Sequence, residues 1–506
     1  MALYASAEIR RTEYAAQAML PPYTLMQRAG KAAANAALQM LSDGAYKARI
    51  LVLIGPGNNG GDALEAATLL TQAGAEVVAL VQGDVNKLPP DAANALARAA
   101  RAGVHMMPPE QFFTIDGIAW SLVIDGLLGI GLQRPLDGAL RSLVATINTL
   151  NCHVLALDVP TGLNADTGMV VGPDGIAIVA DQTITFINDK TGLHTGDGPD
   201  YAGKVTVAGL DILASLAPPA HCWLNTPDLF DSNLQPRARD SHKGSFGSVA
   251  VIGGASGMSG AAVLAARAAA KAGAGKVFIG FLDHGPAYDS NQPELMCRVA
   301  AELDLTSVTL VVGTGLGTSP PAHDLLVKTL MTPRDLVLDA DALNLIAIEP
   351  ALHQLVAQRR QSALHTIMTP HPLEAARLLG VSTANIQSDR LAAARRLAHN
   401  FNAVVVLKGA GSVIAHPNGD AIINPTGNPA LATGGSGDVL SGICGALLAQ
   451  GWSDWNAAMG AVWLHGSAAD LLVSQGCGPI GLTASELIPA VRSVFNELVY
   501  SRSAAG

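Results

Sequence analysis

A glycine-rich segment between Asn428 and Gly442 holds the residues best suited to chemistry in this chain. Its centre, Thr433 to Asp438, contains three glycines and a serine, which leave successive backbone N–H groups free to converge on an anion. The run from Asp438 to Ala449 predicts a helix. A bound anion would therefore face a helix N-terminus, where unpaired amides and the helix dipole favour negative charge. The segment predicts a binding turn for phosphate.

Asp438 stands at the mouth of this turn and places a carboxylate beside the expected phosphate. Because phosphate repels a carboxylate, ground-state binding does not explain this residue. A catalytic base does: Asp438 would accept the proton of a hydroxyl group while that oxygen attacks a terminal phosphoryl group, and the amides would stabilise the transferring charge. The alternative is a helix-capping role for Asp438, which the segment leaves open.

A second glycine turn follows the strand predicted for residues 48–55. Gly55, Gly57 and Gly60 match the dinucleotide fingerprint, and Asp84 follows at roughly the distance of a ribose-binding acid. A helix predicted for residues 63–73 and an apolar strand predicted for residues 76–81 complete a βαβ unit. The pattern predicts a parallel sheet.

This turn also contains Asn58, Asn59 and Asp62, whose side-chain oxygens an ordinary dinucleotide turn does not need. Two later buried strands end in polar residues, one at Asp125 and one at Asp158, the latter followed by Thr161. Each aspartate taken singly also fits a cap or turn. Because polar residues at the carboxyl ends of parallel strands line the ligand crevice of an open α/β sheet, we expect this set to converge.

Further strand ends with polar residues occur from Ser241 onwards, after a looser segment from Leu213 to Asp240, where the chain again alternates apolar strands with glycine turns. Asp339 and Asp341 end a buried strand and suit magnesium, which prefers carboxylates and water. His371 follows in a proline-stiffened turn, and residues 404–412 predict a strand that runs into a loop of small residues suited to the phosphate or ribose of a nucleotide.

Composition limits the possible partners. At 506 residues the chain is too long for one core. Its net charge of −10 disfavours nucleic acid and anionic membranes, so neither is an expected partner. No apolar run reaches the ~18 residues of a membrane span, and the five cysteines lack metal-ligand spacing. A reduced, cytoplasmic protein is expected.

The two glycine segments carry a resemblance to known families. The segment Asn428 to Gly442 resembles the anion-hole signature of the ribokinase-like superfamily, and within it the NAD(P)H-hydrate dehydratases. The run Asn58 to Asp62 resembles the substrate loop of NAD(P)H-hydrate epimerases. The resemblance implies an α/β chain of two domains: a Rossmann-like, three-layer α/β/α domain over residues 1–218 and a ribokinase-like α/β domain over residues 219–506.

The resemblance also implies site residues. Asp438 and Asp158 would be catalytic, and Asn59, Asp125 and Thr161 would hold potassium. For the substrate it implies Asn58, Asn59, Gly60, Gly61, Asp62, Gly129, Ile130, Gly131, Leu132, Gln133, Arg134, Pro135, Asp158, Ala262, Gly315, His371 and Asp438. For the nucleotide it implies Lys408, Gly409, Ala410, Gly411, Ser412 and Gly437. Lys190 is either a substrate contact or a solvated lysine.

The activity implied is repair of hydrated NADH and NADPH, in which water has added across a double bond of the dihydronicotinamide ring and left a hydroxyl at C6. One domain would interconvert the R and S hydrates, NADHX and NADPHX, and the other would dehydrate the S form with ADP or ATP and magnesium. The alternative is a ribokinase-like small-molecule kinase fused to a dinucleotide-binding module. The choice between ADP and ATP stays open, and a homo-oligomer is expected.

Overall fold

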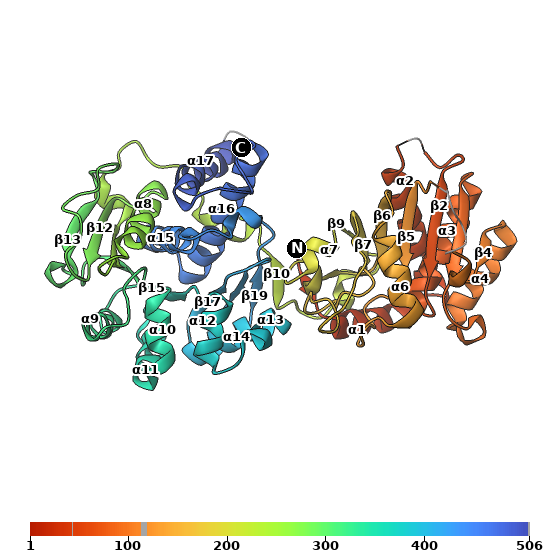
Figure 1. Cartoon of the computed structure of the whole chain (residues 1–506), viewed down its shortest axis with the longest axis horizontal. Coiled ribbons are helices and arrows are strands. Elements are labelled where there is room, and N and C mark those ends of the chain that lie inside the picture. Colours follow the sequence, from red (N-terminus) through yellow and green to blue (C-terminus); the bar gives the residue numbers. More distant parts are fainter. Residues whose placement is uncertain (43, 113–118, 504–506) are drawn as a thin grey trace. The chain divides into compact units, whose positions relative to one another are not determined.

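The computed structural model describes residues 1–42, 44–112 and 119–503, and the chain forms two compact units, Met1–Cys222 and Trp223–Gly506 (Figure 1). The sequence predicts the boundary between residues 218 and 219. Each unit is built on its own largely parallel sheet with helices beside it. This architecture confirms the expected α/β fold class with two domains.

The first unit contains a seven-stranded, fully parallel sheet. In spatial order its strands are β4 (His105–Met107), β3 (Glu76–Val81), β2 (Arg49–Ile54), β5 (Leu122–Gly126), β6 (His153–Leu157), β7 (Gln182–Phe186) and β9 (Lys204–Ala208). The buried residues of the central strands are almost all apolar, because helices cover both faces of the sheet.

The helices of this unit lie on two faces. They are α1 (Ser6–Gln17), α2 (Thr24–Met40), α3 (Asn58–Gln72), α4 (Pro90–Ala102), α5 (Pro109–Phe112), α6 (Gly138–Ile147) and α7 (Gly198–Tyr201), with short 3-10 turns η1 (Val85–Lys87), η2 (Thr191–Leu193) and η3 (Ala214–Leu216). Alternate residues of β2 point to opposite sides: Val52 packs with α2, α3 and α4, whereas Leu53 packs with α6. Two cores therefore flank one sheet, giving three layers. A separate parallel pair joins β1 (Leu3–Tyr4) to β8 (Asp189–Lys190).

Helix α3 begins at Asn58, earlier than the predicted residue 63. The sequence interpretation treated residues 58–62 as an open turn, but Gly60 and Gly61 lie inside the helix because they pack closely. A Cβ atom on Gly60 would collide with the carbonyl oxygen of Gly55, and one on Gly61 would collide with the Met26 side chain. The polar residues of this segment therefore stand on the first turns of a helix.

The second unit contains a ten-stranded sheet. In spatial order its strands are β10 (Cys222–Leu224), β19 (Ala421–Ile423), β18 (Val413–Ala415), β17 (Val404–Leu407), β16 (Thr366–Met368), β15 (Leu336–Leu338), β14 (Thr309–Val312), β11 (Ser248–Gly253), β12 (Lys276–Phe281) and β13 (Met296–Val299). The neighbouring strands β13, β12, β11, β14, β15, β16 and β17 pair in parallel in this spatial order. The pairs β17–β18 and β18–β19 are antiparallel.

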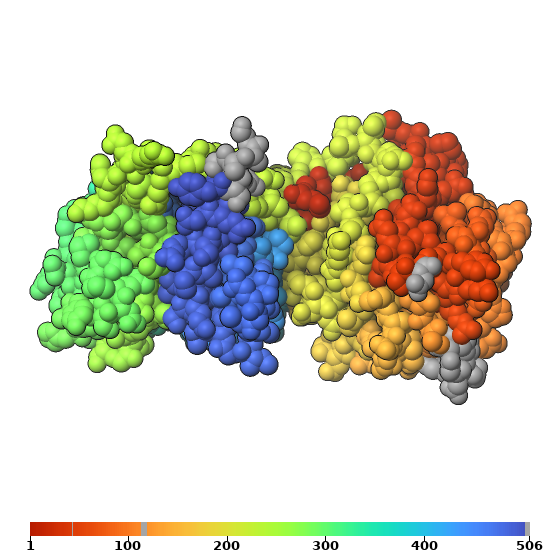
Figure 2. All heavy atoms as spheres, turned by 90° about the horizontal axis from the view of Figure 1, so that it is seen from above, coloured from red at the N-terminus to blue at the C-terminus, as the bar shows by residue number. Residues whose placement is uncertain are grey.

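The helices of the second unit again follow the strands. They are α8 (Ser259–Lys271), α9 (Pro320–Leu330), α10 (Asp341–Ile348), α11 (Pro350–Arg359), α12 (Pro372–Leu379), α13 (Thr383–Ser388), α14 (Arg390–Phe401), α15 (Ser436–Ala449), α16 (Asp454–Ser474) and α17 (Ala484–Ser503). Short 3-10 turns are η4 (Pro227–Asn233), η5 (Lys243–Phe246), η6 (Ala300–Glu302), η7 (Arg360–Ser362) and η8 (Pro429–Leu431). Helix α17 lies on the surface of this unit, in dark blue (Figure 2).

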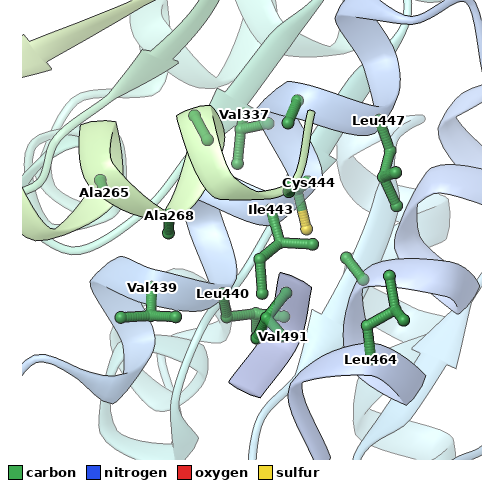
Figure 3. Close-up of a cluster of buried hydrophobic side chains, with 14 of the residues drawn as sticks. Ala265, Ala268, Val337, Val439, Leu440, Ile443, Cys444, Leu447, Leu464 and Val491 are labelled. Atoms are coloured by element: carbon green, nitrogen blue, oxygen red, sulfur yellow. The ribbon is translucent and has the colours of Figure 1, made fainter. Parts of the chain in front are cut away.

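Helix α15 is the buried centre of this unit. Figure 3 shows Val439, Leu440 and Ile443 of this helix packed among Ala268 of α8 and Val491 of α17. Every residue from 439 to 448 is buried. Apolar contact on all sides of the helix fixes its position, and with it the position of the glycine turn at its N-terminus.

Among the described residues no helix combines the length and apolarity needed to cross a bilayer.

The separate sheets predict that the units fold independently. Ala217 and Ala220 pack on the core of the first unit, whereas Cys222 begins β10 of the second sheet. We therefore expect fragments 1–221 and 222–506, expressed apart, each to show a cooperative thermal transition, and their circular dichroism spectra to add up to that of the whole chain.

Fragment 1–216 is the control, because it lacks both alanines and should melt at a lower temperature than fragment 1–221. An insoluble or unfolded 1–221 or 222–506 would contradict the independence of the units.

Candidate active sites at the carboxyl edges of the two sheets

The carboxyl ends of β2, β5 and β6 in the first unit open into a cavity of about 710 Å³. The chain enters the sheet at β2 and adds strands on both sides, so the cavity lies where the strand order reverses, the usual ligand crevice of such sheets. Of the residues expected to bind substrate, the lining includes Asn58, Asn59, Asp62, Gly129, Ile130, Gly131, Leu132, Gln133, Arg134 and Asp158. Gly60, Gly61 and Pro135 are not part of it: Gly60 and Gly61 are buried within α3, and Pro135 lies against Gly172.

Asp158 is held in an unusual conformation directly after β6. Its φ of 67° is in the left-handed region, which costs a residue with a Cβ atom free energy and is common at functional sites. Its Oδ1 lies 2.7 Å from the Nζ of Lys190, and its Oδ2 accepts a hydrogen bond from the backbone N–H of Ile130 at 3.3 Å. These contacts aim the carboxylate at the cavity.

Lys190 is fully buried, so the solvated alternative for this residue is wrong. Besides its ion pair with Asp158, its Nζ donates hydrogen bonds to the Thr185 hydroxyl at 2.7 Å and the Phe186 carbonyl at 2.9 Å. A buried ammonium group needs such partners to offset the loss of water. The paired lysine compensates the Asp158 charge inside the protein.

Asp125 and Thr161 meet at the end of β5, below the cavity. The backbone N–H and the hydroxyl of Thr161 donate to the two Asp125 oxygens, each at 2.8 Å. Burial raises the pKa of Asp125 to about 6, although the hydrogen bonds from Thr161 and Leu127 oppose that rise. The side-chain amide of Asn59 is buried, and neither its oxygen nor its nitrogen has a hydrogen-bond partner. An unpaired buried amide suits a cation with oxygen ligands, and the Asp125 carboxylate and the Thr161 hydroxyl are further oxygen groups at this edge of the sheet.

Asp62 is a further acidic group of the cavity lining. Burial raises the pKa of Asp62 well above its usual value, and the neighbouring carboxylates Asp158 and Glu13 raise it further. Asp84, by contrast, caps a 3-10 turn by accepting a hydrogen bond from the N–H of Asn86 at 3.0 Å. The dinucleotide fingerprint indicated a ribose-binding acid at Asp84, whereas the structure gives this carboxylate a capping contact and leaves it outside the cavity lining.

In the second unit, the carboxyl ends of β15 and β17 place Asp339 and Lys408 together. The Lys408 Nζ lies 2.8 Å from Oδ1 of Asp339, and the Ser441 hydroxyl donates to Oδ2 at 2.5 Å. Burial lowers the pKa of Lys408, but Asp339 and Glu374 outweigh it and raise that pKa overall. Because both Asp339 oxygens have protein partners, this residue fits contact with a magnesium ion through water better than direct ligation.

The glycine turn comes to this ion pair from a distant part of the chain. Gly435 caps α15 with a φ of 90°, a left-handed conformation that glycine adopts without strain. A Cβ atom on Gly437 would lie 3.2 Å from the Lys408 Nζ and 3.9 Å from Asp339 Oδ2. The N-terminus of α15 and the lysine therefore face one another, as an anion site requires.

Asp438 stands on the first turn of α15. Burial raises the pKa of Asp438 to about 7, and the carboxylate of Asp339 raises it further while Lys408 lowers it. A carboxylate with a pKa near neutrality is suited to accept a proton at physiological pH. The helix-cap alternative receives no support, because the structure records no side-chain cap on α15.

His371 and Glu374 occupy the start of α12 after β16. The Nδ1 of His371 accepts hydrogen bonds from the N–H groups of Leu373 and Glu374 at 3.2 and 3.3 Å, while the Glu374 carboxylate accepts the His371 N–H at 2.8 Å. Burial and the nearby Lys408 lower the pKa of His371. Burial also raises the pKa of Glu374 to about 7. His371 is therefore neutral at pH 7.

The loop after β17 closes on itself. The Ser412 hydroxyl donates to the Gly409 carbonyl at 3.0 Å, and the Gly409 N–H donates to the Ser412 hydroxyl oxygen at 3.3 Å. Buried Arg390 donates to the Lys408 carbonyl at 3.2 Å and holds the loop from below. Ala410 and Gly411 complete this short turn.

Ala262 and Gly315 lie in a neighbouring pair of turns. Ala262 is fully buried on α8 beneath Gly254, and the carbonyl of Gly315 accepts the N–H of Ala255 at 2.7 Å. These contacts join the turn after β11 to the turn after β14. A substrate role for Ala262 and Gly315 stays a prediction.

Sequence reasoning left the role of Lys190 open between two alternatives and did not single out the hydroxyl of Ser441. Lys190 had a signal in its position after β7, and Ser441 lies one helical turn after Asp438 on α15. Across residues 1–42, 44–112 and 119–503, no group of three or more His, Cys, Asp or Glu side chains is arranged to hold a metal ion.

Two family models match this chain, one within each structural unit. Residues 249–491 match the sequence model of a family described as NAD(P)H-hydrate dehydratase, and residues 22–192 match one described as the YjeF-related protein N-terminus. The bifunctional NAD(P)H-hydrate repair enzyme Nnr of Coxiella burnetii is 40% identical, covering 98% of this chain and 99% of that protein. The Escherichia coli enzyme of the same name is 37% identical, covering 98% and 94%.

A solved structure gives a partial match. It is an ADP/ATP-dependent NAD(P)H-hydrate dehydratase from Bacillus subtilis, co-crystallised with ATP and Mg²⁺. That protein is 30% identical with a TM-score of 0.47, and the match covers 55% of this chain and 98% of the other.

The ion pair of Lys408 predicts a stability effect. Lys408→Met leaves the buried Asp339 without its cation, and removal of one partner of a buried pair costs about 3 kcal/mol. We expect the free energy of unfolding, measured in urea by circular dichroism, to fall by about this amount, and Lys408→Met combined with Asp339→Asn to recover part of it.

Lys328→Met on exposed α9 is the matched control and should change the free energy of unfolding by less than about 0.5 kcal/mol. Equal effects of the two lysine substitutions would contradict a stabilising role for the Lys408 pair.

Proposed function

This chain belongs to the family of bifunctional NAD(P)H-hydrate repair enzymes, and on that premise we propose which of its residues carry out each reaction. The enzyme is both an isomerase and a lyase: it epimerises the R and S hydrates of NAD(P)H and dehydrates the S form in a nucleotide-dependent reaction. Family membership replaces the alternative of a kinase fused to a dinucleotide-binding module.

Dehydration takes place at the glycine turn before α15. Asp438 accepts the proton of the C6 hydroxyl while that oxygen attacks the terminal phosphoryl group of ADP or ATP. The lone pair of the ring nitrogen then expels phosphate, because phosphorylation has made a poor leaving group into a good one. The observation that carries this proposal is the position of Asp438, with its pKa near 7, beside Lys408 at the helix N-terminus.

The nucleotide lies along the loop after β17. Lys408 and the amides around Gly437 compensate its phosphate charge, and Gly409 to Ser412 provide a narrow turn for the rest of the molecule. Magnesium, which accompanies ATP in the Bacillus subtilis dehydratase, supplies charge neutralisation when bound. Asp339 and Asp341 would hold it, with Asp339 fixed in place by Lys408 and Ser441.

Epimerisation takes place in the cavity of the first unit. Asp158 faces the substrate as a catalytic base. The segment Gly129 to Arg134, which lines the cavity, contacts the substrate. Asn59, Asp125 and Thr161 would hold a potassium ion, and the unpaired buried amide of Asn59 supports this assignment. Potassium supplies a fixed positive charge next to the substrate when bound.

The first test concerns Asp438. Asp438→Asn cannot accept the hydroxyl proton, so we expect kcat of S-hydrate dehydration to fall at least about 100-fold while the nucleotide binds as before, measured by NAD(P)H absorbance and calorimetry. In the unaltered enzyme kcat/KM should rise with pH through about 7, because only ionised Asp438 is a base, and the variant should lose this dependence.

Glu497→Gln, an exposed carboxylate-to-amide change on α17, is the control and should leave kcat unchanged. Near-normal turnover of folded Asp438→Asn would exclude Asp438 as the base.

The second test separates the two reactions. Asp158→Ala should stop interconversion of the R and S hydrates, whereas dehydration of the S hydrate should continue. The interconversion is measured by chromatography in the absence of nucleotide. Replacing potassium by a bulky organic cation should slow only the epimerisation, because that cation does not fit among Asn59, Asp125 and Thr161. Loss of both activities, or of neither, would contradict this division.

A further inference from the structure

The N-terminal helix α1 is fixed beside the epimerase cavity, although it precedes residue 22, where the match to the N-terminal family begins. Strand β1 pairs in parallel with β8, so that Tyr4 lies opposite Lys190. The backbone N–H and the hydroxyl of Ser6 donate to Asp166 Oδ1 at 2.6 and 2.8 Å. These contacts place the first turn of α1 against the residues around Asp158.

One face of α1 forms part of the cavity wall. Arg10, Glu13, Tyr14 and Gln17 line the cavity together with Asp158, and their spacing of three and four residues places them on one side of the helix. Thr12 and Ala16, by contrast, are buried against the protein. The polar face of α1 is therefore turned towards the substrate space.

Glu13 shares this space with the proposed catalytic carboxylate. Burial raises the pKa of Glu13, and the charge of Asp158 raises it further, while Arg10 and Lys190 lower it. Lys190 pairs directly with Asp158 at 2.7 Å but makes no such ion pair with Glu13 among the described contacts. Among the described residues, four carboxyl groups line the cavity: Glu13, Asp62, Asp91 and Asp158. Of these, Glu13 and Asp158 lie in different environments, because Lys190 pairs with Asp158, and such a difference assigns one group as acid and the other as base.

We propose that Glu13 is a second catalytic residue of the epimerase site, the general acid that acts opposite the base Asp158. The inference rests on the proposed role of Asp158 in epimerisation. It gives a catalytic role to a residue of α1, a helix that the N-terminal family match does not include.

The reaction follows from the C6 hydroxyl next to the ring nitrogen. Glu13 donates its proton to this hydroxyl, the C6–O bond breaks, and water leaves with the bonding electrons while the nitrogen lone pair forms an N=C6 double bond. A second water then attacks C6 from the other face, the double-bond electrons return to nitrogen, and Asp158 accepts the proton that this water loses. Transfer of that proton to Glu13 through cavity water restores both groups, so atoms and charge balance.

The test uses the full-length enzyme with Glu13→Gln, whose amide keeps the shape of the side chain but cannot serve as the acid. We expect kcat of R-to-S interconversion to fall at least about 100-fold with KM changed by less than about threefold, and S-hydrate dehydration to stay normal. Glu13→Asp should recover at least about tenfold over Glu13→Gln. In ¹⁸O-labelled water, the epimerised hydrate of the unaltered enzyme should carry one solvent oxygen.

Arg11→Gln is the matched control on the same helix, because Arg11 is 67% exposed and pairs only with Glu8 at 3.9 Å among the described ion pairs. Normal epimerisation by Glu13→Gln, equal activity of Glu13→Gln and Glu13→Asp, or absence of label would each overturn the proposal. If Asp158→Ala stops epimerisation and Glu13→Gln does not, only the role of Glu13 fails. If Asp158→Ala leaves epimerisation intact, the proposed site itself fails.

Discussion

Both sites depend on the parallel pairing of the strands in the two sheets. Parallel strands end at the same edge, so residues far apart in the chain, such as Asp125 and Asp158 or Asp339 and Lys408, meet where their strands stop. The buried, apolar strands fix this edge because any shift in register would move their side chains out of the two cores. The pairing of the strands therefore determines which side chains come together in the site of each unit.

In each unit a lysine compensates the charge of an aspartate at a strand end. Each unit places the aspartate in a dry environment and pairs it with the lysine: Lys190 lies 2.7 Å from Asp158, and Lys408 lies 2.8 Å from Asp339. A buried carboxylate without such a partner would favour its neutral form. Each ion pair fixes the charge of its aspartate, while the pKa of a neighbouring carboxyl group, Glu13 or Asp438, is raised.

Close packing determines how near the backbone comes to a ligand. In the first unit Gly60 allows the start of α3 to lie against the end of β2, and in the second Gly437 allows the start of α15 to lie beside Lys408. Both helices direct their N-terminal amides at the carboxyl edge of the sheet, where the helix dipole favours phosphate. The apolar surroundings of α15 keep this geometry rigid.

The sequence by itself determined the α/β fold class with two domains, the glycine turn before Asp438 and the strand-end positions of Asp125 and Asp158, because periodicity and turn chemistry are local properties. It did not determine the start of α3, which depends on contacts of Gly60 with the preceding strand. Only the tertiary structure decided that Lys190 is buried against Asp158 and that Glu13 faces the same cavity. Those contacts join segments well separated in the chain, and strand order and packing, which are non-local, bring them together.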